Sequence, residues 1–113
     1  MGAFATSESH KSRHHQPIRV PTQRASIYRA AKEMVADLAG WKLLAEDERQ
    51  GTLTCRKENG FLGGVSTITI SVEGPEGVPS TTVNVRSESA GALLARDKGN
   101  VAEFVRPFFR RVC

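Results

Sequence analysis

Five polar residues in the C-terminal third of the chain have the types needed to bind a small anion. Arg86, Ser87 and Ser89 lie in and after an alternating segment, and Asp97 and Asn100 follow shortly after it. A guanidinium group can bind both oxygens of a phosphate or carboxylate. The same residues also suit a structural role, in which Arg86 pairs with Asp97 while the serines and Asn100 satisfy loop and helix-end amides. Both interpretations stay open at this point.

The rest of the chain offers little for catalysis. Its three histidines, His10, His14 and His15, all precede residue 16, so the predicted folded region has no histidine to act as a general base. The glycine-rich stretch at 59–64 joins two predicted strands and does not lead into a helix, unlike a nucleotide-binding loop. We therefore expect that the protein is not an enzyme. A small enzyme that uses Arg86 and Asp97 is the less favoured alternative.

The two cysteines, Cys55 and Cys113, are far apart in the chain and have no partner at the spacing of metal ligands. Cys55 alternates with Leu53 and is expected to point into a core, whereas Cys113 is expected to be a free thiol. The N-terminal histidines fit a polar segment better than a metal site. We predict no metal, no cofactor and no structural disulfide, which is typical of a reducing compartment.

The positive charge of the chain is concentrated at its ends. The sequence has 16 Lys and Arg against 12 Asp and Glu, a net charge of +4. Residues 1–24 hold four basic residues and one acidic residue, and residues 96–113 hold five and two. Such ends are either solvated tails or a means of attraction to an anionic membrane surface.

The first six residues fit the pattern for N-myristoylation, with Gly2 as the acceptor. One acyl chain binds membranes weakly, so a basic segment is the expected second signal. The basic residues that follow are Lys11, Arg13, Arg19 and Arg24. No apolar run approaches the about 20 residues that span a bilayer, and the N-terminus lacks the apolar core of a secretory signal. We expect a cytoplasmic or peripheral membrane location.

Hydrophobic periodicity predicts two helices. The first begins after Thr22 or Ser26 and stops at Gly40, a residue that can adopt the left-handed conformation. The second begins at Asp97 or Asn100 and reaches residue 112, with a kink or break at Pro107.

Alternation of apolar and polar residues predicts four strands, at 41–46, 53–56, 66–73 and 81–89. Residues 1–21 show no such period and are expected to form a basic, flexible tail. Ile18 and Val20, which lie between two prolines, also allow a short edge strand there.

These elements predict an α+β fold for residues 22–113. Short connections favour antiparallel neighbours, and the two helices must cover the apolar face of the sheet. The expected architecture is a two-layer sandwich, a four-stranded antiparallel sheet with two helices on one face, in the order α-β-β-β-β-α, after a disordered N-terminal tail. Trp41 is expected to pack on Phe104 and Phe108. The other sheet face is expected to be open and lined by Ser, Thr, Asn, Arg and Lys.

Three short motifs carry a family resemblance. They are Gly40-Trp41 after the first helix, Arg86-Ser87-Glu88-Ser89 at the end of the last strand, and Asp97-Lys98-Gly99-Asn100 before the last helix. With them, residues 22–112 resemble the domain-of-unknown-function 1499 family. That resemblance implies a small protein that is often membrane-associated and has no assigned activity. Where this family usually has an arginine, the chain has Ala90. The element order also resembles the kinase-associated domain that binds acidic phospholipids.

The favoured function is that of a non-enzymatic binding or assembly module with a protein partner, met at the open sheet face or the basic ends. The alternative is a peripheral membrane protein that binds anionic lipid. Sequence-specific nucleic-acid binding is not expected, because the sheet positions that would face a base hold Thr, Ser and Asn instead of aromatic residues.

Overall fold

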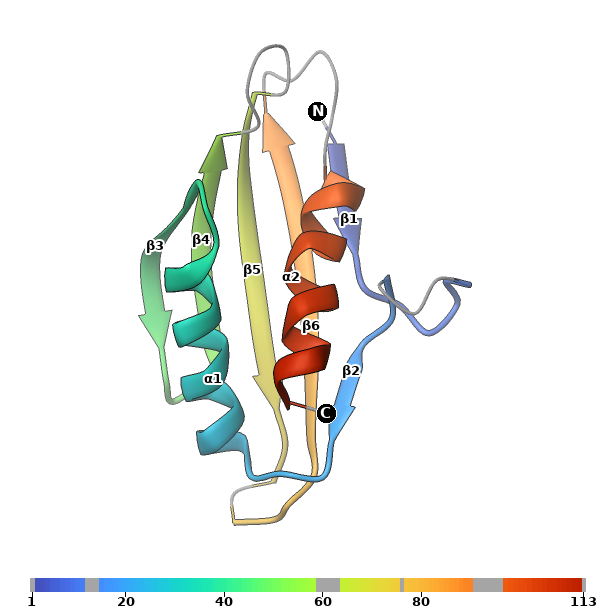
Figure 1. Ribbon diagram of the computed structural model, residues 1–113, viewed down its shortest axis with the longest axis vertical. Coiled ribbons are helices and arrows are strands. Elements are labelled where there is room, and N and C mark those ends of the chain that lie inside the picture. Colours follow the sequence, from blue (N-terminus) through green and yellow to red (C-terminus); the bar gives the residue numbers. More distant parts are fainter. Residues whose placement is uncertain (1, 12–14, 59–63, 76, 91–96, 113) are drawn as a thin grey trace.

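The computed structural model of the protein describes residues 2–11, 15–58, 64–75, 77–90 and 97–112. Two helices lie side by side on one face of a single sheet (Figure 1). The helices are α1 (Arg24–Asp37) and α2 (Asp97–Val112), and the strands are β1 (Gly2–Ala5), β2 (Ile18–Val20), β3 (Trp41–Asp47), β4 (Thr52–Glu58), β5 (Val65–Glu73) and β6 (Thr81–Ala90). The predicted connection at 59–63, as well as Arg13, His14 and Cys113, lies outside the described residues.

The α+β class and the antiparallel sheet are confirmed, but the sheet has six strands and the prediction of four is wrong. The strands follow the order β1-β6-β5-β4-β3, and β2 also pairs with β6. Both additional strands come from the segment predicted as a disordered tail, so that prediction is corrected for Gly2–Ala5, whereas the alternative of a short edge strand at Ile18–Val20 is confirmed.

The length of β6 explains how both N-terminal strands join the sheet. Nine of its ten residues, 82–90, pair with β5 along one edge. Along the other edge, the half that contains Arg86 and Ser89 pairs with β1, and the half that contains Thr81 and Val83 pairs with β2. The β1 sequence, Gly-Ala-Phe-Ala, has no apolar–polar alternation. Main-chain pairing with β6 holds this strand in the sheet, and such pairing does not require a side-chain pattern. The sequence pattern therefore gave no sign of it.

The helix ends agree with the expectations in part. Gly40 has the expected left-handed conformation, with φ +81°, but it does not stop the helix: α1 ends at Asp37, and its C-cap is the extended Leu38. The N-cap of α1 is Gln23, which makes no side-chain capping bond, and not Thr22 or Ser26. α2 continues through Pro107 to Val112, so the proline does not end the helix. The buried rings of Phe104 and Phe108 on either side of it hold this part of α2 against the sheet.

The core lies between the helices and the inner face of the sheet. Trp41 is 8% exposed and its ring centroid lies 6.1 Å from that of Phe104, which in turn lies 4.9 Å from Phe108. The aromatic anchor expected at this position is therefore confirmed. Both sheet and helices supply further fully buried side chains, among them Leu53, Ile68, Ile70, Val72, Val83, Val85, Val101 and Val105. In the described part of the chain, neither helix has the length and apolar character needed to cross a membrane.

Two neighbouring residues of β2 test whether the N-terminal strands belong to the folded unit. Ile18 is 2% exposed, whereas Arg19 faces away from the core and pairs with Glu8. We expect Ile18→Ala to lower the free energy of unfolding by about 2–5 kcal/mol, because it removes a buried side chain. Arg19→Ala should cost less than about 1 kcal/mol, as for other exposed ion pairs. Urea unfolding measures both, and equal, small effects would contradict the placement of β2.

Candidate functional site

The alternation of side chains along β6 divides the predicted site between the two faces of the sheet. Ser87 and Ser89 point inward and are 0% and 3% exposed, whereas Arg86 and Glu88 point outward and are exposed. Asp97 and Asn100 are buried on the inner face. The structure thus brings four of the five predicted residues together and leaves Arg86 on the opposite face.

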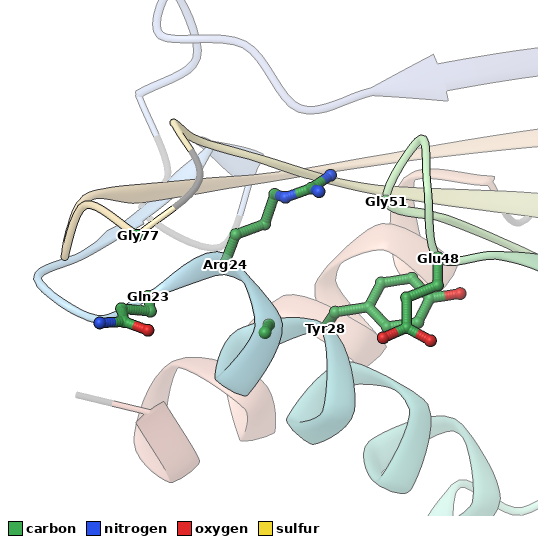
Figure 2. A pocket seen from close by; sticks show the side chains of 7 residues that line it. Gln23, Arg24, Tyr28, Glu48, Gly51 and Gly77 are labelled. Carbon is green, nitrogen blue, oxygen red and sulfur yellow. The ribbon is translucent and has the colours of Figure 1, made fainter.

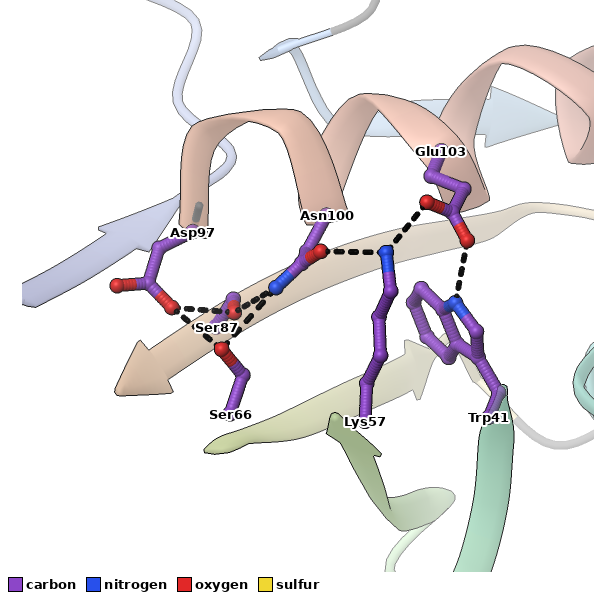
Figure 3. A network of polar contacts seen from close by, with 7 residues as sticks. All are labelled: Trp41, Lys57, Ser66, Ser87, Asp97, Asn100 and Glu103. Atoms are coloured by element: carbon purple, nitrogen blue, oxygen red, sulfur yellow. Dashed lines mark hydrogen bonds and ion pairs between the residues drawn. The ribbon is translucent and has the colours of Figure 1, made fainter. Parts of the chain in front are cut away.

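Asp97 is the centre of the inner cluster. It is the first residue of α2, where a negative charge is favoured by the helix dipole. Its Oδ1 accepts hydrogen bonds from Ser66 (3.2 Å) and Ser87 (2.7 Å), and its Oδ2 accepts one from Ser89 (2.7 Å). Asn100 Nδ2 donates to the hydroxyls of Ser66 and Ser87 at 3.1 and 3.4 Å (Figure 3). The carboxylate therefore sits in a pocket of hydroxyl groups from two strands.

A second carboxylate extends the cluster along α2. Lys57 Nζ donates to Asn100 Oδ1 at 2.8 Å and to Glu103 Oε2 at 2.6 Å. Glu103 Oε1 accepts a hydrogen bond of 2.6 Å from the Trp41 indole. Figure 3 shows one continuous path of polar contacts from Asp97 to Trp41, which fastens α2 to β3, β4, β5 and β6. We call these eight residues the polar network: Trp41, Lys57, Ser66, Ser87, Ser89, Asp97, Asn100 and Glu103.

The strand register brings the sheet residues of the polar network together. Trp41 pairs with Lys57, Lys57 with Ser66, and Ser66 with Ser89, so the four form one row across the sheet. Lys57, Ser66 and Glu103 were not predicted from the sequence as members of this site. Polar residues every three positions on the inner side of α2, at 97, 100 and 103, were the available signal. The cross-strand row depends on register and has no local signature.

The polar network has the features of a structural element. A serine nucleophile needs a base that takes its proton, usually histidine, and the described histidines, His10 and His15, belong to the segment between β1 and β2. Within the described residues, no buried side-chain nitrogen or oxygen lacks a hydrogen-bond partner. The expected ion pair between Arg86 and Asp97 is not formed, since the Arg86 Nε pairs with Glu88 at 2.6 Å. Ser87, Ser89 and Asn100 satisfy the Asp97 carboxylate and one another.

Arg86 belongs to the open face of the sheet. It borders a shallow cleft of about 370 Å³, which is also lined by Ala5, Thr6, Thr69, Ser71, Glu73, Asn84 and Val85. Thr6 Oγ1 donates to Asn84 Oδ1 at 2.8 Å and so closes one end of this surface. Thr54, Thr69 and Arg86 form a row across three strands. The cleft therefore presents hydroxyl, amide and guanidinium groups on a nearly flat support.

Gly2, the predicted lipidation site, lies in β1 opposite Ser89 of β6. The strand places it at the end of the row that begins at Trp41. Acylation of Gly2 remains a prediction.

A separate cavity of about 360 Å³ lies at the N-terminus of α1 (Figure 2). Arg24 projects from the helix toward the turn at Gly51 and donates to the Arg49 carbonyl at 3.3 Å. Tyr28 donates to the Thr52 carbonyl at 3.2 Å, and burial, followed by the charges of Glu46 and Glu48, raises the pKa of its phenol. Gly51 has φ +73° and lies so close to Val72 that a Cβ would stand 2.2 Å from the Val72 carbonyl oxygen. The sequence analysis did not find this cavity.

Cys55 is fully buried, as predicted, and its thiol is free. Burial raises the pKa of the Cys55 thiol from its ordinary value of 9.0 to about 12. The arrangement suits a core residue and not a nucleophile.

The contribution of Asp97 can be measured with a matched pair of carboxylate-to-amide variants. Asp97→Asn weakens three hydrogen bonds to a buried charge, and we expect a loss of about 1–3 kcal/mol in unfolding free energy. Glu88→Gln, on the exposed side of β6, should stay within about 0.5 kcal/mol of the parent. Urea unfolding at neutral pH compares them. Equal stabilities would show that the polar network contributes nothing to the fold.

The Cys55 thiol should make stability depend on alkaline pH. A pKa that is higher in the folded state means that the stabilisation is complete below pH 9, the unfolded value, and is lost as pH rises toward 12. In a Cys113→Ser background, Cys55→Val should therefore flatten the fall of unfolding free energy above pH 9. In the same Cys113→Ser background, native protein at pH 8 should also react with iodoacetamide far more slowly than urea-unfolded protein, because the Cys55 thiol is buried and its pKa is raised. Rapid native labelling would contradict both expectations.

Comparison with known proteins bears on the fold alone. No protein-family model matches the chain, and no curated protein matches it. Among solved structures, the chain is similar to the one described as the crystal structure of Ara h 8.0201, with a TM-score of 0.54 and 15% identity over 98% of both chains. This likeness supports an α+β arrangement of an antiparallel sheet with helices on one side.

Proposed function

We propose that the protein is a non-enzymatic binding module whose protein partner docks on the open face of the sheet. The observation that carries this proposal is that both helices pack on the same face (Figure 1), so the opposite face of β4, β5 and β6 presents its side chains outward. Those side chains are exposed or half-buried, and they include Arg56, Thr67, Thr69, Ser71, Asn84 and Arg86.

The composition of this face favours a polar, reversible contact. Hydroxyl and amide groups form the centre, while two exposed ion pairs within single strands, Arg56 with Glu58 and Arg86 with Glu88, stand on it. A partner that carries its own charged and hydrogen-bonding groups can exchange with these pairs at small cost, because exposed ion pairs contribute little. A regular strand support keeps the groups fixed, which lowers the entropy lost on binding.

A catalytic use of Arg86 and Asp97 has less support, because the two side chains lie on opposite faces of the sheet. A peripheral membrane role through the basic ends is the second candidate. The outward-facing Arg19 of β2 lies on the open face and Arg106 and Arg110 lie on the helix layer, an arrangement that favours separate contacts over one continuous basic surface. The suggested relation to the domain-of-unknown-function 1499 family rests on the motifs alone and remains a proposal.

Site-specific photocrosslinking tests the proposed surface. A photoreactive phenylalanine at Ser71, in the cleft of the open face, should form covalent adducts with a defined partner in native cells. The matched control is the same residue at Ser26, which is exposed on α1. Adducts that appear equally at Ser26, or only there, would contradict docking on the open face.

Once the partner is identified, a second pair of variants measures the energy of the contact. Thr69→Arg fills the cleft with a bulky cation, and Ser26→Arg makes a comparable change on the helix layer. We expect Thr69→Arg to weaken partner binding by about tenfold or more, whereas Ser26→Arg should leave it unchanged. Calorimetric titration gives both values, and thermal unfolding verifies that each variant is folded.

A further inference from the structure

A second surface lies on the helix layer, on the side of the molecule opposite the open sheet face. A groove of about 490 Å³ runs from the end of α1 along α2. Its walls are Leu38, Gly99, Ala102, Pro107 and the aliphatic parts of Glu103 and Arg106. Because most of these side chains are small or apolar, the groove can accept a large apolar side chain from another molecule.

A row of cations follows the groove on the outer side of α2. Lys98, Arg106 and Arg110 are exposed, and with Ala102 they occupy successive i, i+4 positions, so the four residues follow one inclined ridge along the helix. In the described part of the chain, none of the three forms an ion pair. Their backbone positions span about 18 Å at the helical rise per residue. Arg111 differs, because it pairs with Asp37 at 2.9 Å.

Glu103 is the acidic residue that lines the groove, and its negative charge does not cancel the positive charge of these three cations. The Glu103 carboxylate is bound by Lys57 Nζ and by the Trp41 indole, each at 2.6 Å, as part of the polar network (Figure 3). Asp97, the other acidic residue of α2, is buried among three serine hydroxyls. Both carboxylates of α2 are therefore engaged by groups of the sheet, and the outer side of the helix presents unpaired positive charge beside an apolar groove.

We propose that this groove binds an acidic amphipathic helix of a protein partner. Carboxylates at every fourth position of such a helix match the spacing of Lys98, Arg106 and Arg110, and a leucine or phenylalanine between them would enter the groove. Complementary charge would set the orientation and the rate of association. A lipid surface is the less suitable occupant, because the large hydrophobic residues that are exposed among the described residues, Leu44 and Val78, lie on β3 and in the β5–β6 connection and not on α2.

A synthetic peptide serves as the probe. It is fluorescein-labelled, about 14 residues or roughly four helical turns long, with glutamates four residues apart and two leucines on the same face. We expect its fluorescence anisotropy to rise on titration with the full chain. The same peptide with serine in place of leucine, or lysine in place of glutamate, should bind at least about tenfold more weakly, since apolar burial and charge are both required. No rise with the acidic leucine peptide would overturn the proposal.

Charge-reversal variants locate the contact. Arg106→Glu should weaken binding of the acidic peptide by about tenfold or more. Lys42→Glu makes the same charge change on β3, where the side chain is exposed, and should leave the affinity unchanged within about twofold. Equal weakening by both variants would overturn the proposal, because it would mean that only net charge matters. Circular dichroism verifies the fold of both variants.

Two further experiments test whether the peptide occupies the groove and whether the surface binds lipid instead. Ala102→Trp fills the groove without a change of charge and should also weaken peptide binding. Unchanged affinity in that variant would overturn the groove as the binding site. Vesicles that contain phosphatidylserine are the lipid arm: Arg106-dependent vesicle binding without peptide binding would assign the surface to lipid and overturn the proposal. None of these results depends on the Ser71 crosslink, so the proposal for the groove and the proposal for the open sheet face are tested independently.

Discussion

The alternation of side chains along β6 sets the character of both faces of the molecule. β6 is paired along its length with β5 on one edge and with β1 and β2 on the other, so it cannot rotate or slip without breaking three strand pairs. Its inward residues pass from Val83 and Val85 in the core to Ser87 and Ser89 beneath the start of α2. Its outward residues place Arg86 and Glu88 on the open face. One register therefore fixes the packed layer and the exposed surface at the same time.

The placement of α2 follows from that register. Phe104 and Phe108 fill the apolar part of the inner face, and Asp97 begins the helix in a pocket of serine hydroxyls. Burial of a carboxylate is costly unless its hydrogen bonds are made, and here three hydroxyl donors supply them. In the same way, the Lys57 ammonium and the Trp41 indole donate the hydrogen bonds that satisfy the Glu103 carboxylate. Apolar packing holds the helix on the sheet, and the polar network sets its position along the helix axis.

The contacts that the carboxylates of α2 make with the sheet also determine which charged groups remain on the outer side of this helix. Because Asp97 and Glu103 are engaged with the sheet, the outer side of the helix is left with Lys98, Arg106 and Arg110 around a groove of small residues. On the other side of the sheet, hydroxyls and paired charges present a flat polar surface. The two surfaces differ in shape and charge, so the two proposed contacts would be made with different partners.

The sequence by itself was enough to predict the helices and strands whose buried apolar residues recur at regular spacing. Two helices and the strands β3 to β6 follow from periodicity, because the core selects Val, Ile, Leu and Phe at regular spacing. It also grouped Ser87, Ser89, Asp97 and Asn100 correctly. Only the tertiary structure decided that Gly2–Ala5 and Ile18–Val20 join β6, that Arg86 faces away from Asp97, and that Lys57, Ser66 and Glu103 complete the network. β1 carries no apolar–polar alternation, the alternation of Ile18 and Val20 does not specify the strand with which they pair, and contacts across a sheet depend on register between segments distant in sequence.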